Sequence, residues 1–180
     1  LSVGSAVIVN TFCCILFGIC VVAAILLGCR PKDYVRLLLD PKVVTNFTAT
    51  YGNEVFLMNV GCFGFFILGY YNLIGAEFNG VTFGVIFCML CTCNAGSHPA
   101  NVFPIMVGYA LISWLFQLVA PFAHGDFTLT LNAQAIVVGL CYANGLSLFS
   151  DKYGWFWGMV SAMLHYCMVT TTPLVHGGMC

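Results

Sequence analysis

The side chains best suited to handling a solute are mostly neutral amides and imidazoles. An amide both donates and accepts hydrogen bonds without the cost of burying a charge, which suits a path for a small polar or ionic solute. The same groups can instead hold transmembrane helices together, at about 1 kcal/mol each, and both interpretations stay open. The candidates for a solute path are Asn59, Asn79, Asn94, His98, Asn132, Gln134, Asn144 and His165.

The two candidate histidines have different surroundings. His98 lies in a polar turn, where a solvent-facing loop and a functional position are both open. His165 falls in the middle of an apolar run, so it should bond to a partner helix or line a cavity. Glu54 and Glu77 lie at the ends of predicted spans. Each is either a carboxylate at the membrane surface or a site for a coupling ion.

The sequence has no arrangement typical of an enzyme or of a metal centre. It contains no Gly-x-Ser-x-Gly, His-Glu-x-x-His or phosphate-loop motif. Cys88 and Cys91 have the spacing of a ligand pair, but no second such pair completes a site. We therefore expect no enzymatic activity, no cofactor and no metal. Most of the 11 cysteines lie in apolar runs, so we expect free thiols.

The composition assigns the chain to the membrane. Of 180 residues, 61% are hydrophobic and 6% are charged, whereas about 25% of a soluble globular protein is charged. The net charge of −1 argues against a nucleic-acid partner. We expect an all-α, polytopic bundle of transmembrane helices in the plasma membrane, in contact with the lipid bilayer and compatible with a homo-oligomer.

Six apolar runs predict six membrane spans, since a helix needs about 20 residues to cross a bilayer. They cover 3–28, 54–73, 78–93, 102–119, 129–148 and 155–175. Four of the five basic residues lie between Arg30 and Lys42, which places this segment in the cytoplasm. Alternating spans then bring the turn 94–101 and the loop at Lys152 to the same side.

A weak internal repeat relates two parts of the chain. Glycine pairs recur at a separation of about 74 residues, and Asn59 and Asn132 correspond at about 73. Glycines four apart share a helix face and let another backbone come close, so we expect them to pack helices together. The predicted packing glycines are Gly80, Gly84, Gly154 and Gly158.

The repeat divides one integral membrane domain, 1–180, into three parts. Residues 1–44 hold the first span and the cytoplasmic loop, 45–121 form the first repeat, and 122–180 form a truncated second repeat. With three spans each, the two copies would be inverted, as in many transporters that bind substrate near the membrane midplane. The chain begins without methionine, so we expect a fragment of a longer protein.

Three stretches, 79–84, 96–108 and 176–178, resemble an uncharacterised bacterial family of multi-spanning membrane proteins, the domain-of-unknown-function family 1576. The asparagine-glycine start and the His-Pro-x-Asn turn are unusual together. The resemblance covers about 50–180 and implies a protein about twice as long, without an established substrate. The chain also resembles urea-transporter-like folds in plan, although it lacks their Asn-Pro signature.

These observations predict a transporter or channel for a small polar or ionic solute. The alternative is a non-transporting structural or assembly subunit whose glycine faces bind another membrane protein. A polar cavity near Asn59 and Asn132 would favour transport, and a tightly filled core would favour the alternative.

Overall fold

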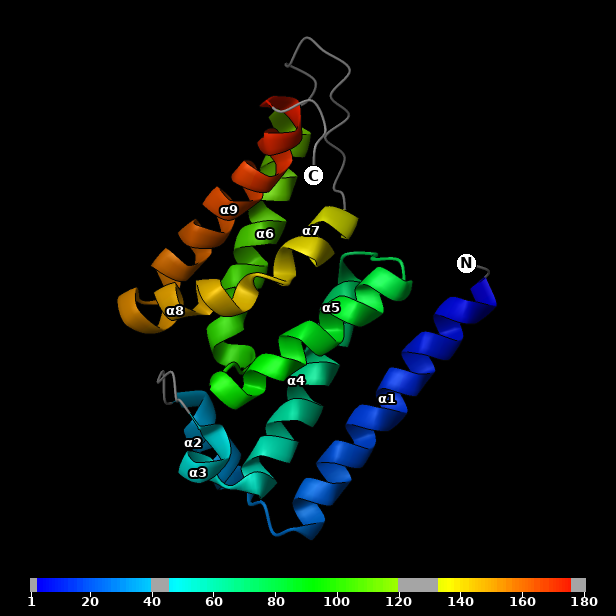
Figure 1. Cartoon of the computed structure of the whole chain (residues 1–180), viewed down its shortest axis with the longest axis vertical. Coiled ribbons are helices and arrows are strands. Elements are labelled where there is room, and N and C mark those ends of the chain that lie inside the picture. The colour runs from blue at the N-terminus through cyan, green and yellow to red at the C-terminus, as the bar shows by residue number, and fades with distance from the viewer. Residues whose placement is uncertain (1–2, 40–45, 120–132, 176–180) are drawn as a thin grey trace.

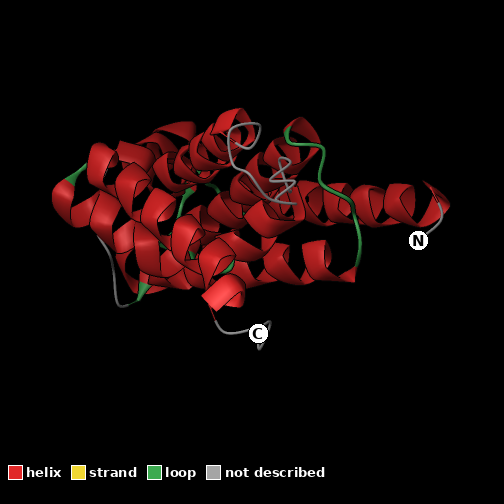
Figure 2. Ribbon diagram, turned by 90° about the horizontal axis from the view of Figure 1, so that it is seen from above, coloured by secondary structure: helices red, strands yellow, loops and turns green. Residues whose placement is uncertain are grey.

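Helices make up every regular element in the part of the chain that the computed structural model describes, residues 3–39, 46–119 and 133–175 (Figure 1, Figure 2). The expected all-α fold is therefore confirmed. In chain order the elements are α1 (Val3–Leu26), α2 (Pro31–Leu39), α3 (Phe47–Tyr51), α4 (Asn53–Leu73), α5 (Gly80–Cys91), the 3-10 turn η1 (Thr92–Ala95), α6 (Pro99–Val119), α7 (Ala133–Leu140), α8 (Ala143–Tyr153) and α9 (Trp155–Val175).

The helices α1 and α4 form the first close pair and run antiparallel to each other (Figure 1). Glycines of α4 let the two backbones approach. A Cβ atom on Gly61 would lie 2.8 Å from the carbonyl oxygen of Phe17, and one on Gly64 would lie 2.6 Å from the Phe17 ring. The aromatic ring is therefore fully buried in a groove that only glycine leaves open.

The second close pair is α6 and α9, and here too a glycine sits at the contact. A Cβ atom on Gly108 of α6 would lie 2.5 Å from the carbonyl oxygen of Met159 in α9. Further along, the Tyr166 hydroxyl donates to Ser113 Oγ at 3.3 Å. Because the contacts advance in the same direction along both helices, α6 and α9 run parallel.

Two short helices, α5 and α7, pack against each other between the two pairs (Figure 1). α5 is 12 residues long and continues into η1, and α7 has 8 residues. The buried side chains Ile86 and Met89 of α5 join Ile136 of α7 in one apolar core. The long pairs thus frame a centre built from helices too short to cross a membrane alone.

The predicted count of six spans is not confirmed. Within the described residues, three segments are long and apolar enough to cross a membrane: Ala6–Leu26, Asn53–Leu73 and Pro99–Phe116. The third predicted span, 78–93, becomes α5 and the η1 turn. The fifth predicted span, 129–148, is wrong as a single helix, because α7 and α8 are separate elements.

A tertiary contact explains the break between α7 and α8. The Tyr109 hydroxyl of α6 donates to the Gly139 carbonyl oxygen at 3.0 Å, and the same oxygen accepts the backbone N–H of Tyr142 at 3.0 Å. That second bond spans three residues, which is the tighter 3-10 pattern that often closes a helix. The helix therefore ends where a side chain from α6 meets its backbone.

The four predicted packing glycines do not behave alike. A Cβ atom on Gly158 would lie 2.7 Å from Ser150 Cβ, so this glycine does pack α9 against α8. Gly154 forms the turn between these helices at φ +93°. No other described atom lies within 4 Å of a Cβ atom on Gly80 or Gly84, so these two do not pack helices within the described chain. The internal repeat stays a prediction.

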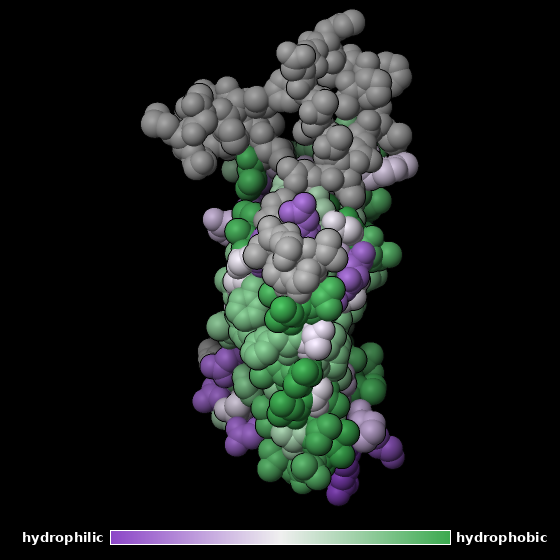
Figure 3. All heavy atoms as spheres, turned by 90° about the vertical axis from the view of Figure 1, so that its right-hand side faces the viewer, coloured by the Kyte–Doolittle hydropathy of each residue, from purple (hydrophilic) through white to green (hydrophobic). Residues whose placement is uncertain are grey.

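The outer surface carries many apolar side chains. Ile8, Ile15 and Val22 of α1 are all more than half exposed. In Figure 3 hydrophobic residues cover most of the described middle of the molecule, and hydrophilic residues lie toward both ends of the coloured surface. Such exposed apolar helices are compatible with an integral membrane protein, in which lipid covers this surface.

Replacing Gly61 by alanine should lower stability, because the new Cβ would overlap the Phe17 carbonyl oxygen. Overpacking of this kind costs about 1–3 kcal/mol. Gly69→Ala on the same helix is the matched control, since no other described atom lies within 4 Å of its Cβ position. That variant should be neutral or stabilised by up to about 1 kcal/mol. Equal Tm values for the two variants in detergent would contradict the close α1–α4 contact.

Candidate functional site

A tight turn joins η1 to α6 and sets the position of the first functional side chains. Gly96 ends η1 at φ +97°, a left-handed conformation that favours glycine. The chain then enters α6 at Pro99, and a proline is well tolerated at the first position of a helix because it has no N–H to satisfy. Ser97 and His98 therefore lie directly before the start of a long apolar helix.

The side-chain amide of Asn101 holds this turn together. Its Oδ1 accepts the backbone N–H of His98 at 3.0 Å, and its Nδ2 donates to the Gly96 carbonyl oxygen at 3.1 Å. Asn101 is 5% exposed, so these bonds form away from solvent. The amide thereby bonds to backbone groups on both sides of the turn that precedes α6.

The same amide connects the turn to α8. Asn101 Nδ2 also donates to Asp151 Oδ2, at 3.4 Å. The other carboxylate oxygen, Asp151 Oδ1, is buried and has no hydrogen-bond partner among the described residues. Burial raises the pKa of the Asp151 carboxyl from 3.8 to about 6, and the hydrogen bond from Asn101 partly opposes this rise. The carboxyl therefore titrates close to neutral pH.

These groups line a cavity of about 280 Å³. Its walls come from α2, the turn before α6, the start of α6, the end of α8 and the start of α9. The lining residues are Leu38, His98, Ala100, Asn101, Ser150, Asp151, Gly154 and Trp155. The cavity thus brings together the three segments that the charge pattern predicts on one side of the membrane: the basic segment after the first span, the turn 94–101 and the loop at Lys152.

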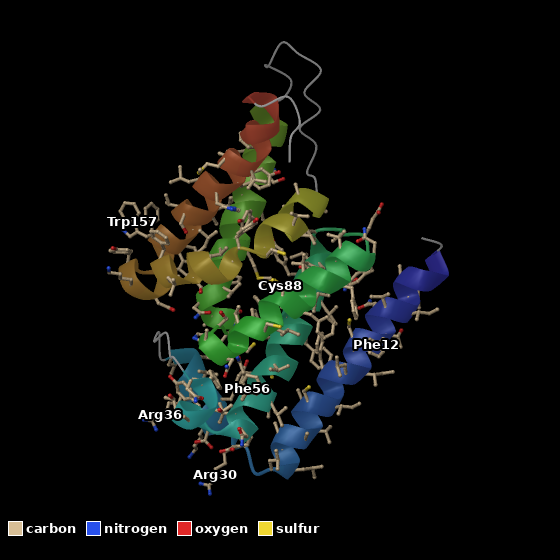
Figure 4. The ribbon with its side chains drawn as sticks, in the orientation of Figure 1. Phe12, Arg30, Arg36, Phe56, Cys88 and Trp157 are labelled. Carbon is tan, nitrogen blue, oxygen red and sulfur yellow. The ribbon has the colours of Figure 1, made fainter. Side chains whose placement is uncertain are left out.

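The nearby basic residues that the structure describes do not line the cavity. In Figure 4, Arg30 and Arg36 point away from the helices, at the end of the molecule where α2 lies. Lys152 follows Asp151 in the chain, but its Nζ lies over the Tyr153 ring, 5.1 Å from the ring centroid. Among the described lining residues, Asp151 is the one acidic group and none is Lys or Arg. The interior of the cavity is therefore negative.

Asn59 supports the turn from its opposite side. This residue of α4 is completely buried, and its Nδ2 donates to the Ser97 carbonyl oxygen at 2.8 Å. It does not line the cavity, so its contact holds α4 to the turn beside His98. His98 itself is 2% exposed, and the solvent-facing alternative for this residue is wrong because α4 and α8 both hold the turn.

The remaining predicted site residues lie elsewhere. Asn79 caps α5, with Oδ1 accepting the backbone N–H groups of Val81 and Thr82. Asn94 is exposed in η1. Asn132 and the side chains of Gln134 and Asn144 lie outside the described residues.

His165 has the partner helix that the sequence predicts. Its Nδ1 lies 2.5 Å from the Tyr109 hydroxyl of α6, and the Tyr142 ring packs 4.9 Å away. This contact joins α9 to α6 and does not belong to the cavity lining. A structural contact between helices therefore explains this histidine.

Sequence reasoning missed the residues that complete the cavity. In the sequence, Asp151 indicated only a short loop, and Trp155 indicated only an anchor at the membrane interface. Asn101 was only one polar residue of a turn. The signal that could have found them was the predicted topology, which places the turn 94–101 and the loop at Lys152 on one side. Polar residues at adjoining helix ends can meet there.

A family model described as "Protein of unknown function (DUF1576)" matches residues 31–180. The match includes every residue that lines the cavity and leaves out α1. Comparison with curated proteins and with solved structures finds no match.

Replacing Asn101 by leucine should destabilise the fold, because three hydrogen bonds around the turn would be lost. At about 1 kcal/mol for each bond, the expected loss is roughly 2–3 kcal/mol. Asn94→Leu, at an exposed position of the neighbouring η1 turn, is the matched control and should change stability by less than about 0.5 kcal/mol. Denaturant or thermal unfolding in detergent measures both, and an unchanged Asn101→Leu protein would refute the role given to this amide.

Proposed function

Because the chain belongs to the DUF1576 family, whose description names no activity, we propose a function from its own residues. The protein is a multi-pass protein of the plasma membrane that moves a small polar solute across the bilayer. Its solute-binding site is the cavity between α2, α6, α8 and α9.

The observation that carries this proposal is the unpartnered oxygen of Asp151. A carboxylate oxygen withdrawn from water is costly unless it is paired, and Asp151 keeps Oδ1 without a partner in the described chain. The partly buried carboxylate borders a cavity of about 280 Å³ with a mixed polar and apolar lining, close to the size range of small-molecule sites. A ligand that enters the cavity and binds the carboxylate would offset this cost.

The charge distribution supports an opening toward the cytoplasm. Cytoplasmic loops of membrane proteins are enriched in Lys and Arg. Arg30, Lys32 and Arg36 lie beside or on α2, which contributes Leu38 to the cavity, and Lys152 follows Asp151. The proposed binding site therefore opens to the cell interior.

The short central helices support movement of a solute rather than a purely structural role. Transporters commonly place their sites where transmembrane helices are interrupted, because the broken backbone offers polar groups inside the membrane. Among the described residues, one predicted span is interrupted in this way, between α7 and α8. The end of α8 then contributes Ser150 and Asp151 to the cavity.

A second candidate function is a structural or assembly subunit. It is favoured by the α5 face that bears Gly80 and Gly84, because no other described atom covers the space beside these glycines. Helices in membranes often associate through such small residues. In this case a partner helix, from another protein or a second copy of the chain, would occupy the space.

Flux measurements in proteoliposomes test the proposal. The purified protein should carry at least one solute from a panel of organic ammonium ions, neutral amides, carboxylates and inorganic cations faster than empty liposomes. Asp151→Asn should reduce that flux at least tenfold, whereas Asp33→Asn, an exposed acid on α2, should leave it unchanged.

The opposite result also has a clear form. In this case the folded wild-type protein carries no solute of the panel and retains a membrane-protein partner. The Gly80→Leu variant loses that partner. These results would favour the assembly role over transport.

A further inference from the structure

We infer that the ligand of this cavity is a small organic cation, whose ammonium group binds the Asp151 carboxylate while its apolar part lies against Trp155 and Leu38. This inference rests on the proposed function, because it names the solute class of the same site. Charge, hydrogen bonding and size each support it separately.

The charge of the cavity selects the sign of the ligand. Among the described lining residues, Asp151 is the one acidic group and none is Lys or Arg. Arg30 and Arg36 are exposed, and the Lys152 ammonium lies over the Tyr153 ring. The carboxylate would therefore repel an anion, whereas a cation would meet an opposite charge at short range.

The hydrogen-bonding groups of the cavity favour a ligand that donates hydrogen bonds. Asn101 Nδ2 is already shared between the Gly96 carbonyl oxygen and Asp151 Oδ2, and Asn101 Oδ1 accepts from His98. Asp151 Oδ1 is left as a buried acceptor without a donor in the described chain. An ammonium group carries three donors and no acceptor, and its bond to a carboxylate is charge-assisted.

The size and walls of the cavity favour an organic cation over a bare metal ion. About 280 Å³ is several times the volume of one water molecule, which is roughly 30 Å³ in the liquid. Among the described residues no group of three His, Cys, Asp or Glu side chains could hold a metal. The Trp155 side chain adds an aromatic surface, to which ammonium ions bind well, and Leu38 adds an apolar one.

Acidification should weaken this binding. Burial raises the pKa of Asp151 to about 6, so the carboxyl loses its charge as the pH falls through that value. His98, from the turn before α6, is the other ionisable side chain that lines the cavity, and Lys152 of α8 lies over Tyr153. Leu38 of α2 and Trp155 of α9 carry no ionisable group. The loss of the Asp151 charge therefore sets the expected direction of the pH dependence.

Direct binding to the purified protein in detergent tests the inference without any transport assay. The probes are butylammonium, butanol and butyrate, which share a four-carbon chain and differ in charge. Isothermal titration calorimetry at pH 8 should detect butylammonium only. At pH 5 its affinity should fall about tenfold, because about one tenth of a carboxyl with a pKa of 6 stays ionised.

Matched variants connect the binding to this cavity. Asp151→Asn should weaken butylammonium binding at least tenfold at pH 8 and should remove most of the difference between pH 8 and pH 5. Trp155→Leu should also weaken binding, whereas Trp157→Leu, on the outer side of α9 in Figure 4, should not. The comparison of Trp155→Leu with Trp157→Leu still tests the inference if Asp151→Asn fails to fold.

Three results would overturn the inference: tighter binding of butanol or butyrate than of butylammonium, equal binding by Asp151→Asn, or complete displacement of butylammonium by equimolar Na⁺ or K⁺. Failure of the proposed function is a different result. Cation binding without flux in proteoliposomes would reject transport and keep the inference. Flux of a neutral or anionic solute that Asp151→Asn reduces at least tenfold would keep transport through this cavity and reject the inference.

Discussion

The hydrogen bonds of one side chain, Asn101, hold the candidate site in place. Its oxygen accepts the backbone N–H of His98, and its amide nitrogen donates to the Gly96 carbonyl oxygen and to the carboxylate of Asp151. Backbone groups at a helix start need such partners, and the need is strictest where lipid replaces water. One buried amide therefore fixes both the first turn of α6 and its distance from α8.

The long helices supply the rigidity that this arrangement requires. Gly61 brings α4 against α1, and Gly108 brings α6 against α9, each at a separation that leaves no room for a Cβ atom. Between these pairs the chain is short and interrupted, and the polar groups of the turn collect there. Close backbone packing of the long helices and short helices between them therefore occur together in this fold.

Sequence alone predicted the helical class, the membrane environment and the polar turn, because each depends on composition or on local residue types. It could not predict that the run 129–148 divides, since the break follows from the Tyr109 hydroxyl bonding to Gly139. Glycine spacing identified a potential contact face but not which helix packs through such a face. The space beside Gly84 is open, whereas Gly64 of α4 packs against the Phe17 ring of α1. The site was only partly visible because Asp151 lies 50 residues from its partner Asn101.

The central claim is that Asp151 is a partly buried carboxylate held by Asn101 beside a cavity. Its titration is the most direct measurement, made by carbon-13 NMR of the protein with labelled aspartate in detergent micelles and assigned with the Asp151→Asn variant. A pKa of about 6 agrees with burial of the carboxyl. A pKa near the ordinary value of 3.8 would mean that water solvates this group, and the site described above would not exist.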